Sequence, residues 1–329
     1  MNHFHQIAAL LDSYGLDAML LTGEANRFYA SGFHSAGTDG VALVTRKKAY
    51  YFTDSRYIEA AGRSVQGAEI REVGPGRGYG VLLSEALGEQ QVCRLGYEEA
   101  YMTVLEHERY RKALPCDLVP ATELLWKLRT VKDDEELDAM VAAQRIAEKA
   151  LEVILEEIRP GVTEKEIAAR LQYLMLHFGA ENMSFDPIVV SGPNGSLPHG
   201  VPGERTIQNG EFVTMDFGCI YHGYCSDMTR TFFTGEPSEE ERKVYELVRQ
   251  AQAAAEALVK PGVRLCDIDA AARDLITEAG YGPYFNHRLG HFIGLEDHEA
   301  GDVSAVNENV VTPGMCFSIE PGIYLPGRT

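Results

Sequence analysis

The chain has 329 residues, of which 45% are hydrophobic and 24% charged, as in an ordinary globular protein long enough for two domains. Its net charge of −19 argues against nucleic acid or an anionic membrane as a partner and favours cation binding. The six cysteines include no Cys-x-x-Cys pair, and the sequence shows neither a signal peptide nor a membrane-spanning run. We therefore expect a reduced, cytoplasmic protein.

The first part of the chain alternates between helical and strand patterns. Apolar residues at helical spacing predict a helix over residues 3–14, and the run 18–21 predicts a buried strand. The next expected elements are a hairpin of strands 41–44 and 49–52, a helix from 81, a strand end at 96–98 and a helix at 101–113. This order predicts an α/β domain over residues 1–128, in which Asp54 and Arg56 are interpreted as a structural ion pair.

The second part begins near residues 128–133, where the acidic run 133–136 suits the start of a long helix. It contains a repeat: RPGVTEKEIAARL begins at residue 159, and KPGVRLCDIDAAA begins 101 residues later. Each copy lies between two predicted helices and is followed by predicted strands, among them 187–190, 212–219 and 316–319. This duplication predicts two pseudo-symmetric halves, in which two helix pairs cover one curved mixed sheet.

Two aspartates lie in a predicted β-hairpin, EFVTMDFGCIYHGYCSDMTR at 211–230. A two-residue turn at Tyr221 and His222 would place Asp216 directly opposite Asp227, on the same face. Both lie among apolar strand residues, so we expect them to be buried rather than solvated. Two buried carboxylates so close together must share a proton or bind a cation, which favours a metal site.

The other chemically reactive residues lie on loops and strand ends of the same part. His199 is in a Gly/Pro loop, and NHRLGHFIGLEDHE contains His287, His291 and His298. Glu320 ends a predicted strand and directly precedes Pro-Gly. Each residue alone has a structural interpretation, but together they form a set of carboxylates and imidazoles without thiolates. Such a set suits Mn²⁺, Co²⁺, Fe²⁺ or Zn²⁺.

Five short segments in this order resemble the signatures of the pita-bread metallopeptidases, in the branch of Xaa-Pro dipeptidase (prolidase) and aminopeptidase P. They are PHG at 198–200, MDFG at 215–218, SDMTRT at 226–231, GHFIGLEDHE at 290–299 and SIEPGIY at 318–324. NRFYASGF and FTDSRYIEAA, from residues 26 and 52, resemble the creatinase-type N-terminal domain. The resemblance implies an α/β (α+β) protein with a creatinase-like domain, 1–128, and a pita-bread catalytic domain, 129–329, with pseudo-two-fold duplicated halves.

The resemblance also implies a site for two divalent metal ions, with Mn²⁺ as the first choice and Co²⁺, Zn²⁺ or Fe²⁺ as alternatives. Asp216 would hold one ion, Asp227 would bridge both, and His291 and Glu320 would complete the other. Water activated to hydroxide by the two ions would attack the peptide bond before proline in a dipeptide or short peptide. The resemblance further implies a homodimer.

The remaining roles implied by the resemblance concern the substrate. Glu320 would also shuttle a proton. His199 and His298 would contact the substrate carbonyl and the tetrahedral intermediate, and His287 would belong to the substrate pocket. The bond to proline is a tertiary amide without an N–H, so this pocket must accept a ring rather than pair a donor.

The end of the chain departs from the family pattern. In the family, a second glutamate, in a V-R-I-E-D-like segment after the SIEPG strand, bridges both metals. The chain ends at Thr329, where that segment would begin. We therefore expect a fragment that lacks this ligand and the closing strand, with weakened metal binding and low activity.

Three alternatives stay open on the sequence. The enzyme could be a dipeptidase or an aminopeptidase, which differ in the length of peptide they accept. A non-catalytic pita-bread protein would bind peptides or proteins without using the metal ligands. A creatinase-like hydrolase would need no dinuclear cluster, and the presence of Asp216, Asp227, His291 and Glu320 argues against it. Metal content discriminates the last two from a metallopeptidase.

Overall fold

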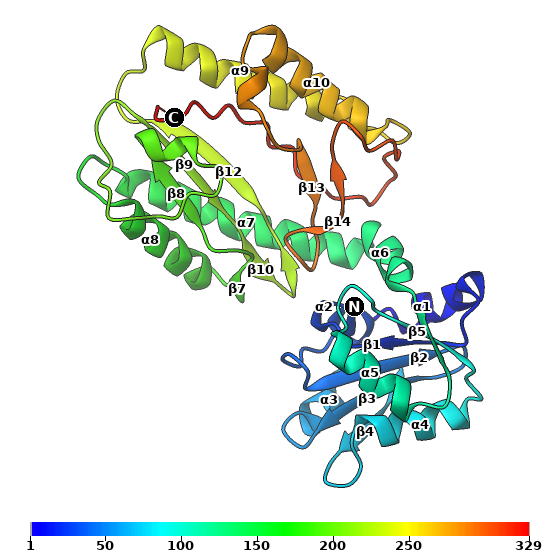
Figure 1. The fold of residues 1–329 in the computed structure, drawn as a ribbon. Coiled ribbons are helices and arrows are strands. Elements are labelled where there is room, and N and C mark those ends of the chain that lie inside the picture. The colour runs from blue at the N-terminus through cyan, green and yellow to red at the C-terminus, as the bar shows by residue number, and fades with distance from the viewer. Residues whose placement is uncertain (1, 329) are drawn as a thin grey trace. The chain divides into compact units, whose positions relative to one another are not determined.

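The computed structural model describes residues 2–328 and divides into two compact units, Met1–Arg129 and Thr130–Thr329 (Figure 1). In the first unit, helices and strands alternate as the sequence predicts. The elements are α1 (Phe4–Leu10), η1 (Leu11–Tyr14), β1 (Ala18–Leu21), α2 (Glu24–Ser31), β2 (Gly40–Thr45), β3 (Ala49–Asp54), α3 (Ile58–Ser64), β4 (Ala68–Val73), α4 (Tyr79–Glu89), β5 (Arg94–Tyr97), α5 (Val104–Ala113), β6 (Asp117–Pro120) and α6 (Thr122–Thr130).

The first unit is built on a six-stranded mixed sheet in the order β4-β3-β2-β1-β5-β6. The predicted hairpin is present, because β2 and β3 pair antiparallel. Strands β1, β2 and β3 are buried along almost their whole length, which explains why they read as continuous apolar runs. The interpretation of Asp54 and Arg56 is confirmed: the Arg56 guanidinium lies 2.6 Å from Asp54 and 2.6 Å from Asp39.

The second unit contains two helix pairs, each followed by short strands. The elements are α7 (Asp134–Glu157), α8 (Glu164–His177), β7 (Asn182–Met183), β8 (Ile188–Ser191), η2 (Gly192–Ser196), β9 (Phe212–Phe217), β10 (Cys219–Tyr221), β11 (Tyr224–Cys225), β12 (Met228–Phe233), α9 (Glu239–Ala257), α10 (Leu265–Glu278), η3 (Gly282–Tyr284), β13 (Gly290–Phe292) and β14 (Glu299–Val303). One apolar core joins α7 and α8 to β8, β9 and β12, and a second joins α9 and α10 to β13 and β14. Figure 1 shows α9 and α10 side by side in this second half.

The predicted duplication is visible in the backbone hydrogen bonds. In the first half, Gly161 N donates to Ile207 O (2.9 Å), and Ile207 N donates to Val162 O (2.9 Å). In the second half, Gly262 N donates to Val311 O (2.9 Å), and Val311 N donates to Val263 O (2.8 Å). Each Pro-Gly-Val loop is therefore pinned by the same pair of bonds to a chain that passes beside it. The two pseudo-symmetric halves are confirmed.

The prediction of one mixed sheet in this unit is wrong. The strands form three small sheets, ordered β11-β10-β7, β12-β9-β8 and β13-β14, and every pairing in them is antiparallel. The predicted strand at 316–319 is not a regular strand either. Phe317 makes an isolated bridge to Phe292, and Ser318 N donates to His291 O (2.9 Å). The segment thus runs beside β13 with too few regular bonds to form a strand.

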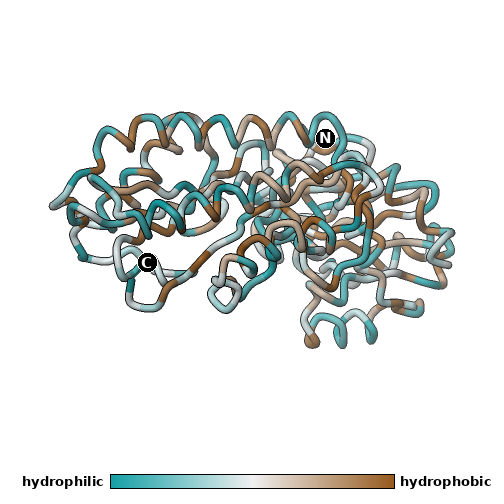
Figure 2. The backbone as a smooth tube through the Cα atoms, turned by 90° about the horizontal axis from the view of Figure 1, so that it is seen from above, coloured by the Kyte–Doolittle hydropathy of each residue, from teal (hydrophilic) through white to brown (hydrophobic). Residues whose placement is uncertain are grey.

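Hydrophilic and hydrophobic residues alternate along the long helices (Figure 2). In α7, for example, Ala139, Ala143, Ala147 and Ile154 are buried, at the spacing of one helical face. Among residues 2–328, no helix has both the length and the apolar character that crossing a membrane requires.

The hairpin that carries the two aspartates has a different register from the predicted one. The turn is at His222 and Gly223, which both have positive φ (49° and 80°), as a two-residue type I′ turn requires. This shift by one residue pairs Tyr221 with Tyr224 and Asp216 with Thr229. Asp227 precedes Thr229 by two residues, so the aspartates are diagonal neighbours rather than opposite each other. The predicted turn position is wrong because glycine, which adopts positive φ without strain, favours the second turn position.

We predict that Gly223→Ala lowers the free energy of unfolding by about 1 kcal/mol, because an L-residue with a Cβ is strained at positive φ. His222→Asn is the matched control. Asparagine tolerates this conformation, so stability should stay within about 0.5 kcal/mol of the wild type. Urea unfolding followed by circular dichroism measures both variants. Equal stability of Gly223→Ala and the wild type would contradict this turn.

Candidate metal centre

The second unit brings candidate ligands from both pseudo-symmetric halves together. Asp216 lies on β9 and Asp227 directly precedes β12, both in the first half. His291 lies on β13, and Glu320 lies in the segment that runs beside β13, both in the second half. Glu320 N donates to Leu289 O (2.9 Å), which fixes this residue next to the β13 strand. The site is therefore formed where the two halves meet.

Three of these residues form a cluster with metal-binding geometry. Nε2 of His291 lies 3.3 Å from Oδ2 of Asp227 and 3.3 Å from Oε1 of Glu320. One potential ligand atom from each of the three residues lies within 4.8 Å of the other two. The side chains of His291 and Asp227 are almost completely buried, while that of Glu320 is partly exposed. One cation can therefore contact all three residues, with access from one side.

Hydrogen bonds to the rest of the chain orient these ligands. Nδ1 of His291 lies 3.2 Å from Phe292 O, so the Nδ1–H donates to this carbonyl and leaves Nε2 free to face the two carboxylates. Oγ of Ser318 donates to Oε1 of Glu320 (2.9 Å) and accepts from His291 N (3.0 Å). Ser318 thus links the backbone of His291 to the carboxylate of Glu320.

Asp216 joins the cluster through its interaction with Asp227. Its Oδ1 accepts a hydrogen bond from Oγ1 of Thr229 (2.9 Å), its partner across the hairpin. Burial raises the pKa of Asp216 to about 8, and the neighbouring charge of Asp227 contributes to the rise. Without a cation, this carboxyl group is therefore mostly protonated at neutral pH.

The electrostatics of the whole cluster favour a cation. Burial, followed by repulsion from Asp227, raises the pKa of Glu320. For His291, burial lowers the pKa, but the contact with Asp227 and the charges of Glu320 and Asp227 outweigh this effect and raise it. Several carboxylates are thus held together at a cost in desolvation and repulsion, which a bound divalent ion would offset. The donor set, three carboxylates and one imidazole, fits such an ion.

His298 lies against His291 but makes different contacts. The two imidazole rings are stacked, with centroids 3.8 Å apart. Nη2 of Arg288 lies 2.9 Å from Nδ1 of His298 and can only donate, so Nδ1 is the acceptor and the proton is on Nε2. Burial, together with the charges of His291 and Arg288, lowers the pKa of His298 to about 4. His298 is therefore a neutral hydrogen-bond donor in this arrangement.

The two remaining predicted residues lie further from the cluster. His287 contacts Phe285 and Tyr324 edge to face, with ring centroids 5.0 and 5.5 Å away. Its Nδ1 lies 2.6 Å from Arg288 O, and its buried Nε2 has no hydrogen-bond partner among residues 2–328. His199 lies on an exposed loop. Burial is the main cause of the lowered pKa of both His287 and His298, and the neighbouring His199 is a minor contributor to each shift.

The sequence analysis missed several residues that contact the site. Asp297 lies with His291 and His298 in a second cluster with metal-binding geometry, and burial raises its pKa to about 7. Arg288 and Thr229 bond directly to predicted site residues. Thr229 could have been found from the pattern, because it follows Asp227 by two residues and so shares its strand face. Arg288 and Asp297 gave no such signal, since charged residues beside histidines are common on loops.

Comparison with known proteins identifies the family. Residues 138–329 match metallopeptidase family M24, and residues 5–131 match the creatinase/prolidase N-terminal domain. The uncharacterized peptidase YqhT of Bacillus subtilis is 40% identical over 321 residues, which are 96% of this chain and 89% of the relative. The uncharacterized peptidase SAS1635 of Staphylococcus aureus is 36% identical over an alignment of 334 positions, which covers 99% of this chain and 93% of the relative.

Solved structures agree with this result. The Xaa-Pro dipeptidase of Bacillus anthracis superposes with a TM-score of 0.94 at 40% identity, covering 99% of this chain and 90% of its own. The X-Pro aminopeptidase of Thermotoga maritima gives a TM-score of 0.91 at 35% identity, with 98% and 92% covered. The prolidase of Pyrococcus furiosus gives a TM-score of 0.89 at 33% identity, covering 98% of this chain and 93% of its own. The chain belongs to metallopeptidase family M24, with a creatinase/prolidase N-terminal domain.

Proposed function

We propose that the protein hydrolyses the peptide bond before proline, in Xaa-Pro dipeptides or N-terminal Xaa-Pro peptides, with two divalent metal ions. The observation that carries this proposal is the buried cluster of Asp227, His291 and Glu320, with Asp216 beside it. Similar chains support the substrate class, since their names describe Xaa-Pro dipeptidases, prolidases and an X-Pro aminopeptidase. Mn²⁺, a homodimer and a cytoplasmic location are parts of the same proposal.

The side chains fit the proposed ions. Asp216 would hold one ion, Asp227 would bridge both, and His291 and Glu320 would complete the second site. When bound, the ions supply a hydroxide nucleophile near neutral pH and polarise the scissile carbonyl. Glu320 is partly exposed and hydrogen-bonded to Ser318, so it is placed to pass a proton to the leaving amine. The second bridging glutamate that the family resemblance implies is not among the described residues and stays a prediction.

The histidines that do not hold metal would handle the substrate. His298 carries its proton on Nε2, so it can donate a hydrogen bond to the oxygen on which negative charge develops. His199 would contact the substrate carbonyl from the exposed loop between β8 and β9. His287 has an unpaired buried Nε2 and an aromatic surrounding, Phe285 and Tyr324. A substrate group that combines an apolar ring with an adjacent polar group, such as a C-terminal proline, suits both the aromatic surrounding and the unpaired Nε2.

The first test measures metal content together with hydrolysis of Ala-Pro and Ala-Pro-Gly after loading with Mn²⁺. It uses the 329-residue chain and a version extended by a closing strand with the expected bridging glutamate. We expect hydrolysis at least in the extended version, and a loss of about 100-fold or more in Asp227→Asn, because that substitution removes the shared ligand. Cleavage of Ala-Pro alone indicates a dipeptidase, and cleavage of Ala-Pro-Gly an aminopeptidase.

The controls of this test separate binding from chemistry. Glu157→Gln removes a surface carboxylate that pairs with Arg170 and should leave metal content and hydrolysis unchanged. Absence of both metal and hydrolysis from the chain and from its extended version would contradict the proposed function.

A second prediction follows from the raised pKa of Asp216. Metal must displace the proton that this carboxyl group carries below about pH 8, so binding should release a proton at pH 6.5 and much less above pH 9. The apparent affinity should rise with pH, by up to about tenfold per unit, and level off above pH 8. Calorimetric titration with Mn²⁺ in buffers of different ionisation enthalpy measures the released protons.

The variant Asp216→Asn tests the assignment of this proton. This variant should bind Mn²⁺ more weakly than the wild type. It should also lose the part of the proton release that occurs near pH 8. Asp297→Asn is the comparison variant, because burial raises the pKa of Asp297 only to about 7. Proton release that is unchanged in Asp216→Asn would show that another group carries the proton.

A further inference from the structure

The loop that carries His199 has little regular structure of its own. It runs from the end of β8 at Ser191 to the start of β9 at Phe212 and contains only the short η2 turn. Leu197, Pro198 and His199 are exposed, and Val201 is 85% exposed. Contacts at the base of the loop must therefore determine where His199 lies.

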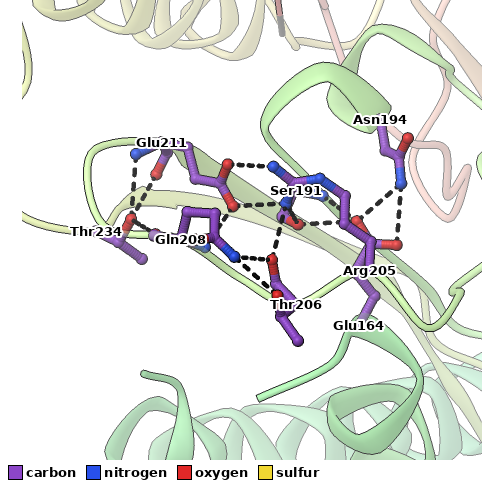
Figure 3. A network of polar contacts seen from close by, with 8 residues as sticks. All are labelled: Glu164, Ser191, Asn194, Arg205, Thr206, Gln208, Glu211 and Thr234. Atoms are coloured by element: carbon purple, nitrogen blue, oxygen red, sulfur yellow. Dashed lines mark hydrogen bonds and ion pairs between the residues drawn. The ribbon is translucent and has the colours of Figure 1, made fainter. Parts of the chain in front are cut away.

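One buried carboxylate bonds to the base of this loop at three places. Glu164 is the first residue of α8 and is 0% exposed. It accepts hydrogen bonds from Ser191 N (2.7 Å), from Nδ2 of Asn194 (3.1 Å) and from Gly203 N (3.3 Å). Ser191 begins the loop, Asn194 lies in the η2 turn, and Gly203 lies on the returning side. The segment between Asn194 and Gly203, with His199 at its centre, is thus closed by one side chain. Figure 3 shows the contact between Glu164 and Asn194.

An adjacent ion pair holds the same base. Arg205 forms a two-pronged contact with Glu211, with its nitrogens 2.7 and 2.5 Å from the two carboxylate oxygens. Its Nη1 also donates to Oγ of Ser191 (2.5 Å), which in turn donates to Glu164 (2.8 Å). Figure 3 shows the two carboxylates on either side of Ser191 and Arg205. Gly192 is packed so closely here that a Cβ would lie 2.3 Å from Glu211, which leaves the loop base little freedom.

Glu164 is not needed to start the helix. Thr163 is the N-cap, and its capping box is completed by Glu166, which accepts from Thr163 N (2.8 Å). A carboxylate in the first helical turn is favourable, but the exposed Glu166 already supplies one. Burying a second carboxylate costs desolvation free energy, which its hydrogen bonds must offset. The start of the helix does not explain this carboxylate, but its bonds to the loop do.

The second pseudo-symmetric half shows what the same position does without the carboxylate. Leu265 occupies the position 101 residues after Glu164, also as the first residue of its helix, and is 1% exposed in the apolar core. The backbone bonds agree in both halves: Glu164 N donates to Arg205 O (3.0 Å), and Leu265 N donates to Asn309 O (2.9 Å). The backbone arrangement is therefore formed with an apolar side chain at this position. The carboxylate occurs in the half whose loop carries His199.

We infer that Glu164 is a positioning residue, whose buried carboxylate holds the loop of residues 192–203 so that His199 faces the substrate. This role rests on the proposed function, because it acts through a histidine that contacts substrate. Glu164 itself lies at the base of the loop and bonds to loop residues rather than to His199. Its loss should displace or loosen His199 and leave the metal ligands in place.

The test compares Glu164→Gln with Glu166→Gln, which removes a carboxylate from the same helical turn and preserves the capping box. In the active, metal-loaded protein, we expect Glu164→Gln to lower kcat/KM on the order of 10–100-fold, with unchanged metal content. Glu166→Gln should keep wild-type values. Glu164→Asp retains the charge and should recover part of the loss. Wild-type kcat/KM in Glu164→Gln would overturn the inference.

A double-mutant cycle with His199→Ala separates positioning from general destabilisation. If Glu164 acts through His199, the double variant should be no slower than His199→Ala alone. The inference is overturned if the double variant loses kcat/KM by the product of the two single losses, or if Glu164→Gln loses bound metal. Either result would show a structural role only.

Hydrogen exchange followed by mass spectrometry provides a readout that needs no activity. In Glu164→Gln, the segment 191–203 should exchange faster than in the wild type, while the equivalent segment beside Leu265, near Asn309, should be unchanged. Equal exchange of 191–203 in both proteins would overturn the inference. If the wild-type protein hydrolyses no Xaa-Pro substrate, the proposed function fails, and the exchange experiment alone then decides whether Glu164 holds the loop.

Discussion

The interaction on which the second unit depends is the close approach of buried carboxylates around His291. Asp216, Asp227 and Glu320 raise the free energy of one another's charged forms, as the raised pKa values of Asp216 and Glu320 indicate. The surrounding protein tolerates this arrangement because hydrogen bonds from Thr229 and Ser318 hold the carboxylates in place. A divalent cation would turn this repulsion into attraction, so the site is preorganised for a metal rather than formed by it.

The duplicated framework explains how such ligands come together from distant parts of the chain. Each half presents short antiparallel sheets beside a helix pair, and the ligands lie on the strands of these sheets or directly beside them. The first half contributes two aspartates through its hairpin, and the second contributes a histidine and a glutamate. The halves keep the same backbone bonds but differ in side chains, as Glu164 and Leu265 illustrate. The two halves thus share a backbone framework, and their side chains give each half its own chemistry.

The sequence predicted the local features of the fold better than its pairings. The helices α7, α8, α9 and α10 follow from apolar spacing, and the first three also have capping boxes; both signals act within a few positions of the chain. The turn of the hairpin was misplaced by one residue, which shifted the pairing by two residues, because the register depends on which two residues adopt positive φ in the turn. The segment 316–319 has the composition of a strand, but too few regular bonds form beside β13. Strand pairing depends on neighbours that sequence patterns do not reveal.

The sequence by itself determined the two-part organisation of the motifs, the duplication and the chemical type of the site, since these depend on residue identity and order. Only the tertiary structure decided that Asp227, His291 and Glu320 share one position, with Asp216 diagonal to Asp227. It also showed that Arg288 sets the proton position on His298 and that Glu164 bonds to the His199 loop. These contacts join residues far apart in the chain, and their geometry arises from packing, which no local pattern encodes.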